Sequence, residues 1–154
     1  MVSEFMRVRL SPELEQGLRP IMTRRDFSRG STLYRYGAVA SGLYLVEKGA
    51  VRVLLPTSDN KSQLLEIAGA GAILGLSESL SGDNYRVTVQ AEEPTSAVFI
   101  ARKDFIQLLN GQQELCMQVV QLLSESLHGL YHRFRSVSAH PGRPRRRSLD
   151  EKLN

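Results

Sequence analysis

Few residues in this 154-residue sequence are grouped in a way that suits catalysis. Its three histidines, His128, His132 and His140, lie near the C-terminus, and none falls in a stretch with strand character. His128 and His132 are one helical turn apart, but they supply only two of the three or four protein ligands that a zinc site needs. We therefore predict no metal site.

Candidate nucleophiles are no better placed. Ser77, Ser79 and Ser81 lie in one short segment, but no histidine is near them in the sequence and no nucleophile-elbow pattern surrounds them. Cys116 falls in an apolar helical row, where a cysteine commonly behaves as a small buried apolar side chain, although a redox role at a dimer seam stays open. The stretch 69–72, Gly-Ala-Gly-Ala, lacks the lysine of a phosphate loop and is interpreted as a tight turn. We predict no catalytic residue and no enzymatic activity.

A segment rich in polar side chains follows Gly75. Along the strand-like run that ends this segment, side chains alternate, so Arg86, Thr88 and Gln90 share one face and the valines between them share the other. The conformation of the preceding loop decides whether Arg86 reaches inward. The alternative is a surface arginine.

Short apolar runs separated by turn residues fill the chain from Arg25 to about Ile100. The clearest are 42–46, 50–55, 63–67 and 86–90. Several short strands at close intervals predict a barrel, roll or sandwich rather than a parallel sheet. Alternation along the runs assigns the apolar wall to Leu43, Leu45, Val51, Val53, Leu65, Ile67, Val87, Val89, Val98 and Ile100.

Helical patterns lie on both sides of the strand region. Ser11 and Pro12 suit the cap and first position of a short helix, which Pro20 should end or kink. Residues 103–109 form a second short helical pattern with a glycine stop at Gly111.

A longer helix is predicted over 112–138. Apolar residues spaced alternately by four and three form a heptad seam typical of a dimer interface: Cys116, Val120, Leu123, Leu127, Leu130, Phe134 and Val137. A second row could instead cover the strands of the same chain, and consists of Leu115, Val119, Leu122 and Tyr131. Because one row can face each way, we predict a homodimer.

Charge and composition place further bounds on the chain. Lysine plus arginine exceed aspartate plus glutamate by 20 to 16, and most of the excess lies in 140–154, where residues 145–147 are all arginine. Such a run could contact phosphate backbones, although a solvated basic linker or tail is the simpler interpretation. The N-terminus lacks the apolar run of a signal peptide, no stretch is long enough to span a membrane, and the single cysteine cannot form an internal disulfide. We expect a cytoplasmic protein with no membrane partner.

The order of the glycines carries a family resemblance. The pattern is Phe27-x-x-Gly30, then Gly37, then Leu43-Tyr-Leu-Val-x-x-Gly49-x-Val51, then Gly71-x-Ile73-x-Gly75. From about Leu10 to Ala139 the chain resembles the cyclic-nucleotide-binding domain of Crp/Fnr (catabolite-activator and fumarate-nitrate-reduction type) transcription regulators. The resemblance implies an α+β fold, with an antiparallel, jelly-roll-like β-roll flanked by short helices and followed by a long C-terminal dimerisation helix. It assigns 1–139 to an effector domain and 140–154 to a linker or tail.

The same resemblance implies where a ligand would sit. The candidate ligand-binding residues are Gly75, Leu76, Ser77, Glu78, Tyr85, Arg86 and Thr88. The family's phosphate-binding arginine falls on Tyr85, and its ribose-binding glutamate falls on Leu76. A leucine cannot accept a hydrogen bond from ribose and a tyrosine cannot balance a phosphate charge, although Arg86 and Glu78 could stand in. We therefore predict no cofactor, with cyclic nucleotides bound weakly or not at all.

The resemblance also sets the expected function. Regulators of this family usually carry a winged helix-turn-helix domain after the dimer helix, whereas 15 residues follow Ala139 here. We expect a regulatory effector and dimerisation domain that contacts DNA only through a domain missing from this chain, with a small-molecule effector as its other expected partner. The alternative is a stand-alone protein-interaction scaffold with no ligand. A polar, anion-friendly pocket beneath Gly75 to Tyr85 would favour the sensor.

Overall fold

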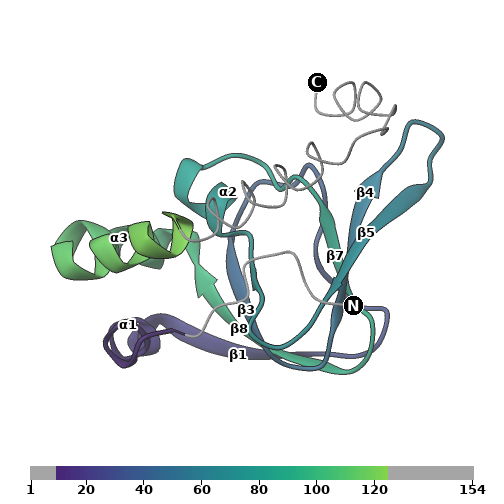
Figure 1. Cartoon of the computed structure of the whole chain (residues 1–154). Helices are drawn as coiled ribbons and strands as arrows, with labels where there is room; N and C mark the ends of the chain where they lie inside the picture. The colour runs from purple at the N-terminus through teal and green to yellow at the C-terminus, as the bar shows by residue number, and fades with distance from the viewer. Residues whose placement is uncertain (1–9, 125–154) are drawn as a thin grey trace, which may run out of the picture. The chain divides into compact units, whose positions relative to one another are not determined.

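The computed structural model describes residues 10–124, in which two antiparallel four-stranded sheets form a β-roll (Figure 1). One sheet has the order β1-β8-β3-β6, from β1 (Met22–Phe27), β8 (Thr95–Ala101), β3 (Gly42–Lys48) and β6 (Ile73–Leu74). The other has the order β2-β7-β4-β5, from β2 (Thr32–Tyr34), β7 (Thr88–Ala91), β4 (Val51–Pro56) and β5 (Ser62–Ala68). The predicted antiparallel roll is confirmed.

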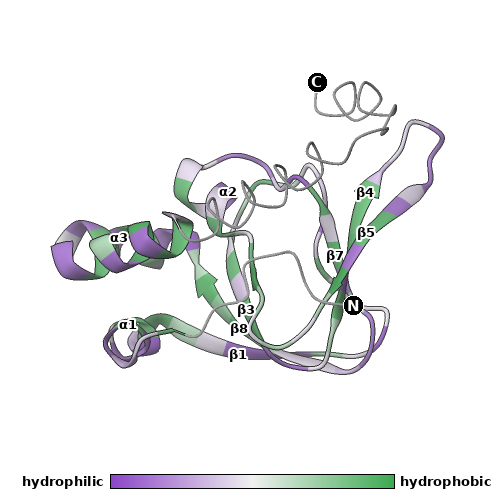
Figure 2. Ribbon diagram, in the orientation of Figure 1, coloured by the Kyte–Doolittle hydropathy of each residue, from purple (hydrophilic) through white to green (hydrophobic). Residues whose placement is uncertain are grey.

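Most of the predicted apolar wall is buried. Figure 2 shows hydrophobic residues concentrated on strands such as β4 and β8. Six of the ten predicted wall residues are buried, namely Leu43, Val51, Val53, Val89, Val98 and Ile100. Three more, Leu45, Ile67 and Val87, are half-buried. Strand β7 shows the expected alternation, whereas β3 and β8 are buried on both faces.

The prediction was wrong at Leu65, which is 43 % exposed. The register between β4 and β5 shifts there, because Val53 pairs with Glu66 while Leu54 pairs with Leu64. Leu65 is thus the extra residue of a β-bulge, and the residues buried beyond it are Glu66 and Ala68. A bulge interrupts the two-residue period on which the prediction depended.

Four α-helices and a 3-10 turn accompany the sheets in the described part of the chain. The capped first helix is confirmed as α1 (Pro12–Leu18), where the backbone N–H of Leu14 donates to Ser11 Oγ at 3.2 Å. It ends in the 3-10 turn η1 (Arg19–Ile21), which contains Pro20. The short helix α2 (Leu76–Ser81) follows β6, and the predicted helix after the last strand is α3 (Arg102–Gly111). Within residues 10–124, no helix is long and apolar enough to cross a membrane.

A further helix covers 113–124 and lies at the start of the predicted dimer helix. Leu115 belongs to the second apolar row, which was expected to cover the same chain. It packs on α1, as shown by the 2.6 Å that would separate its Cδ1 from a Cβ at Gly17. In the predicted dimer seam, Val120 is 48 % exposed, and Cys116 and Leu123 are half-buried. The other seam residues, Leu127, Leu130, Phe134 and Val137, lie outside the described residues, so the dimer helix stays a prediction.

Candidate functional site

The candidate site is built where β6 turns into α2. Gly75 lies at this turn with a φ of 83°, in the left-handed region that glycine adopts most readily. A Cβ at Gly75 would lie 3.1 Å from the carbonyl oxygen of Gly42 and 3.2 Å from Cε1 of Tyr85. The start of α2, the start of β3 and the Tyr85 ring therefore meet at this point without space for a side chain.

Tyr85 lies at the centre of the site and is only 3 % exposed. Its ring stacks on that of Tyr34, with 3.8 Å between centroids and 14° between planes. Its hydroxyl donates to the carbonyl oxygen of Gly42 at 2.6 Å and accepts from the backbone N–H groups of Ser41 and Gly42, each at 3.1 Å. A phenol has one donor and two acceptor positions, so backbone groups satisfy this hydroxyl fully.

More aromatic rings continue from this stack across the roll. The Tyr44 ring lies 6.3 Å from that of Tyr34, 5.0 Å from that of Phe99 and 5.7 Å from that of Phe27, measured between centroids. Arg25 covers the end of the cluster, with its guanidinium carbon 3.8 Å from the Phe99 centroid and Nη1 donating to the Tyr44 hydroxyl at 2.9 Å. Aromatic side chains therefore fill the roll beneath Gly75.

Two of these phenols are held in their neutral form. Burial raises the pKa of Tyr34, and the negative charge of Glu78 raises it further. Burial also raises the pKa of Tyr44, while the hydrogen bond and positive charge of Arg25 oppose this shift. Low solvation of the interior is the common cause, since it disfavours a phenolate.

The other predicted ligand residues lie around this centre. Leu76 is buried, whereas Ser77 is exposed at the start of α2. Glu78 is half-buried, and its Oε2 accepts from the backbone N–H of Arg86 at 3.3 Å. Thr88 is half-buried as well, and its Oγ1 accepts from the backbone N–H of Tyr36 at 2.9 Å.

Arg86 points into solvent. Its side chain is 74 % exposed, and Nη2 lies 3.2 Å from Asp83 Oδ2 in an ion pair. The sequence left two alternatives open for Arg86, and the structure shows it as a surface arginine. Gly75, Leu76 and Tyr85 are brought together, while the guanidinium of Arg86 is directed away from them.

The sequence model described as "Cyclic nucleotide-binding domain" matches residues 24–112, which is more than half of the chain. The chain belongs to the cyclic nucleotide-binding domain family. This confirms the resemblance carried by the glycine pattern.

Two curated relatives of this cyclic nucleotide-binding domain are regulators of the Crp/Fnr type. The transcriptional activator protein FnrA of Stutzerimonas stutzeri is 28 % identical over 103 residues, which cover 67 % of this chain and 42 % of that protein. The cyclic AMP receptor protein of Thermus thermophilus is 24 % identical over 118 residues, which cover 77 % of this chain and 55 % of that protein. The chain thus spans about half the length of the curated relatives it matches.

A solved structure agrees with this assignment. The cyclic nucleotide-binding domain from Methylobacillus flagellatus is 27 % identical and superposes with a TM-score of 0.70, covering 84 % of this chain and 71 % of that one.

Sequence reasoning missed three residues of this cyclic nucleotide-binding domain's central site. Tyr34 stacks on Tyr85 although the two are far apart in the chain, and Ser41 and Gly42 contact the Tyr85 hydroxyl across 44 and 43 positions. No local spacing links such residues. The one available signal was Tyr34 itself, because side-chain alternation in a short strand could have assigned this aromatic residue to the interior.

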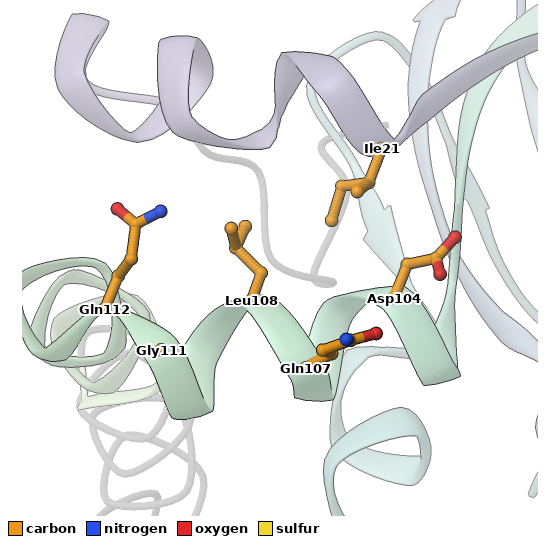
Figure 3. Close-up of a pocket in the computed structure, with 6 residues that line it drawn as sticks. All are labelled: Ile21, Asp104, Gln107, Leu108, Gly111 and Gln112. Carbon is orange, nitrogen blue, oxygen red and sulfur yellow. The ribbon is translucent and has the colours of Figure 1, made fainter.

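A groove of about 330 Å³ lies elsewhere in the domain, between η1 and α3 (Figure 3). It is lined by Ile21, Asp104, Gln107, Leu108, Gly111 and Gln112. None of the predicted ligand residues lines it. Among residues 10–124, no cluster of three or more His, Cys, Asp or Glu side chains is arranged to hold a metal ion.

Proposed function

We propose that this chain is the regulatory effector domain of a Crp/Fnr-type regulator, and that its ordinary cyclic-nucleotide site no longer binds cyclic nucleotides. Membership of the cyclic nucleotide-binding domain family and the two regulator relatives support the class. The single observation that carries the loss of binding is the buried Tyr85 ring, stacked on Tyr34 in the space beneath Gly75.

The missing contacts have a predictable cost. A charge-assisted hydrogen bond to phosphate contributes about 1.5–3 kcal/mol, and a neutral one to ribose contributes about 1 kcal/mol. Leu76 and Tyr85 can supply neither, so a micromolar site would weaken by roughly 100-fold to 1,000-fold or more. A nucleotide would also have to displace the Tyr34–Tyr85 stack, which weakens binding further.

The charges near the site also disfavour a bound cyclic phosphate. The cation nearest in sequence to Tyr85, Arg86, is in solvent and already paired with Asp83. The half-buried carboxylate of Glu78 is close enough to raise the pKa of Tyr34, so it would repel a cyclic phosphate placed beside that ring.

The proposal has further parts that follow from the family. We propose a homodimer through the helix that begins at 113, non-enzymatic action, and contact with DNA through a separate domain of a longer regulator. The partial coverage of both curated relatives supports the last part.

A protein-interaction scaffold without a ligand is the second candidate. The observation in its favour is a pair of uncovered leucines on β5, Leu64 at 45 % and Leu65 at 43 % exposure.

Calorimetric titration of the purified chain with cyclic AMP, cyclic GMP and cyclic di-GMP tests the proposal. We expect no binding in the micromolar range for any of the three, and no effect of Arg86→Ala. Arg29→Ala is the matched control, because Arg29 is an exposed arginine in the turn between β1 and β2. Low-micromolar binding of cyclic AMP that disappears in Arg86→Ala but persists in Arg29→Ala would show a working nucleotide sensor.

A further inference from the structure

One side chain joins segments of this domain that are distant in the sequence. The Tyr85 hydroxyl makes three hydrogen bonds to the backbone at the start of β3, at Ser41 and Gly42. Its ring contacts Tyr34 of β2 and lies against Gly75 at the start of α2. Tyr85 therefore connects β2, β3 and α2.

The backbone of Tyr85 is held as firmly as its side chain. Its N–H donates to the carbonyl oxygen of Ala38 at 2.8 Å, and its carbonyl oxygen accepts from the N–H of Gly37 at 2.9 Å. The neighbouring residue Asn84 forms an isolated bridge with Val39. The segment between α2 and β7 is thus fixed to 37–39 on one side and, through the phenol, to 41–42 on the other.

The packing around the hydroxyl leaves little freedom for it to move. A Cβ at Gly42 would lie 2.3 Å from the carbonyl oxygen of Ile100, so the backbone that receives the hydroxyl is itself packed against β8. By contrast, Asp83, Asn84 and Arg86 are all exposed. The Tyr85 side chain is the buried part of an otherwise exposed segment.

In a protein whose binding segment is ordered by its ligand, the ligand's binding energy offsets the entropy lost on ordering. Here the ordering contacts come from the chain itself. We infer that the Tyr85 hydroxyl replaces a ligand as the group that orders α2 and the segment after it, so that this region adopts its regulatory arrangement without a small molecule. This inference rests on the proposed function, in which no cyclic nucleotide occupies the site.

Amide hydrogen exchange of the full chain, followed by NMR, tests this with Tyr85→Phe, which keeps the ring and removes the hydroxyl. The informative amides are those of Ser79 and Gly82, which donate to the carbonyl oxygens of Gly75 and Glu78 at the two ends of α2. We expect both to exchange at least 10-fold faster in the variant, while Val51 and Val53 in β4 change only with global stability. Tyr34→Phe is the matched control, since it removes the hydroxyl of the stacked partner.

The outcomes separate the two proposals. If only the Ser41 and Gly42 amides accelerate in Tyr85→Phe, the hydroxyl makes a local contact and the inference is overturned while the proposed function stands. If Tyr34→Phe accelerates Ser79 and Gly82 equally, loss of either buried hydroxyl loosens the region and the Tyr85 hydroxyl has no particular ordering role, so the inference is again wrong. If a free cyclic AMP concentration of 10 μM, about 10-fold above a micromolar Kd and well below the weakened Kd of roughly 0.1–1 mM expected for this site, slows these amides several-fold in the unmodified chain, the proposed function itself fails.

Discussion

At the scale of single residues, buried tyrosines form the centre of this roll. Tyr85 satisfies its hydroxyl through three hydrogen bonds with the backbone of Ser41 and Gly42, and Tyr34 stacks on its ring. Stacked aromatic pairs contribute about 0.5–1.5 kcal/mol beyond the area they bury. The Tyr34–Tyr85 stack therefore supplies packing that stabilises the site.

The buried Tyr34 phenol predicts a specific alkaline weakness. Its pKa in the folded state is raised above the unfolded value of about 10, so its contribution to stability is fully present below that pH and is lost as pH rises through the folded-state pKa. The free energy of unfolding, measured by urea denaturation, should fall less between pH 8 and pH 11 in Tyr34→Phe than in the unmodified chain. Tyr36→Phe, at a tyrosine that is 54 % exposed, is the control. Parallel loss of stability in all three proteins would contradict this assignment.

At the scale of elements, the bulge in β5 changes which residues of that strand face the core. Val53 is fully buried on β4, whereas Leu65 on the neighbouring strand is displaced by the register shift and exposed. Edge strands commonly carry such bulges, which also discourage pairing with another chain.

Two substitutions on these neighbouring strands should therefore differ sharply. Val53→Ala removes buried methyl groups and should lower the free energy of unfolding by roughly 1–3 kcal/mol, through lost burial and a small cavity. Leu65→Lys should change it by no more than about 0.5 kcal/mol, as at most exposed positions. Urea denaturation of both variants measures this. A large loss in Leu65→Lys would mean that the leucine is covered in solution.

At the scale of the whole molecule, the helix that begins at 113 offers apolar residues in two directions. Leu115 packs on α1, while Val120 of the predicted seam is exposed. An exposed apolar position in an unbroken heptad pattern is typical of a surface that is covered by a partner helix.

Charged substitutions in the seam test the dimer. Leu123→Glu combined with Leu130→Glu places like charges at two seam positions, and sedimentation at high micromolar concentration should then give a monomer in place of a dimer. Gln121→Glu combined with His128→Glu is the control, because both positions fall outside the two apolar rows and their spacing, and Gln121 is exposed. A monomeric unmodified chain, or a dimer that survives the seam substitutions, would rule out this interface.

The sequence by itself determined the family and the roll. Glycine order, strand alternation and the cap at Ser11 are local signals, because each depends on neighbours within a few residues and on fixed backbone geometry. Leu76 and Tyr85 could likewise be recognised as departures from the family pattern by their position after Gly75 and before the last strands. These features needed no knowledge of the packing.

Only the tertiary structure decided what surrounds Tyr85. The Tyr85 hydroxyl meets Ser41 and Gly42 across more than 40 positions, and its ring meets Tyr34 across a similar distance, so no local period could pair them. The solvent-facing direction of Arg86 depends on the loop that holds Tyr85 inward, and the exposure of Leu65 depends on a register shift against β4. Each of these outcomes is set by contacts between segments, where packing rather than the local sequence fixes which side chain is buried.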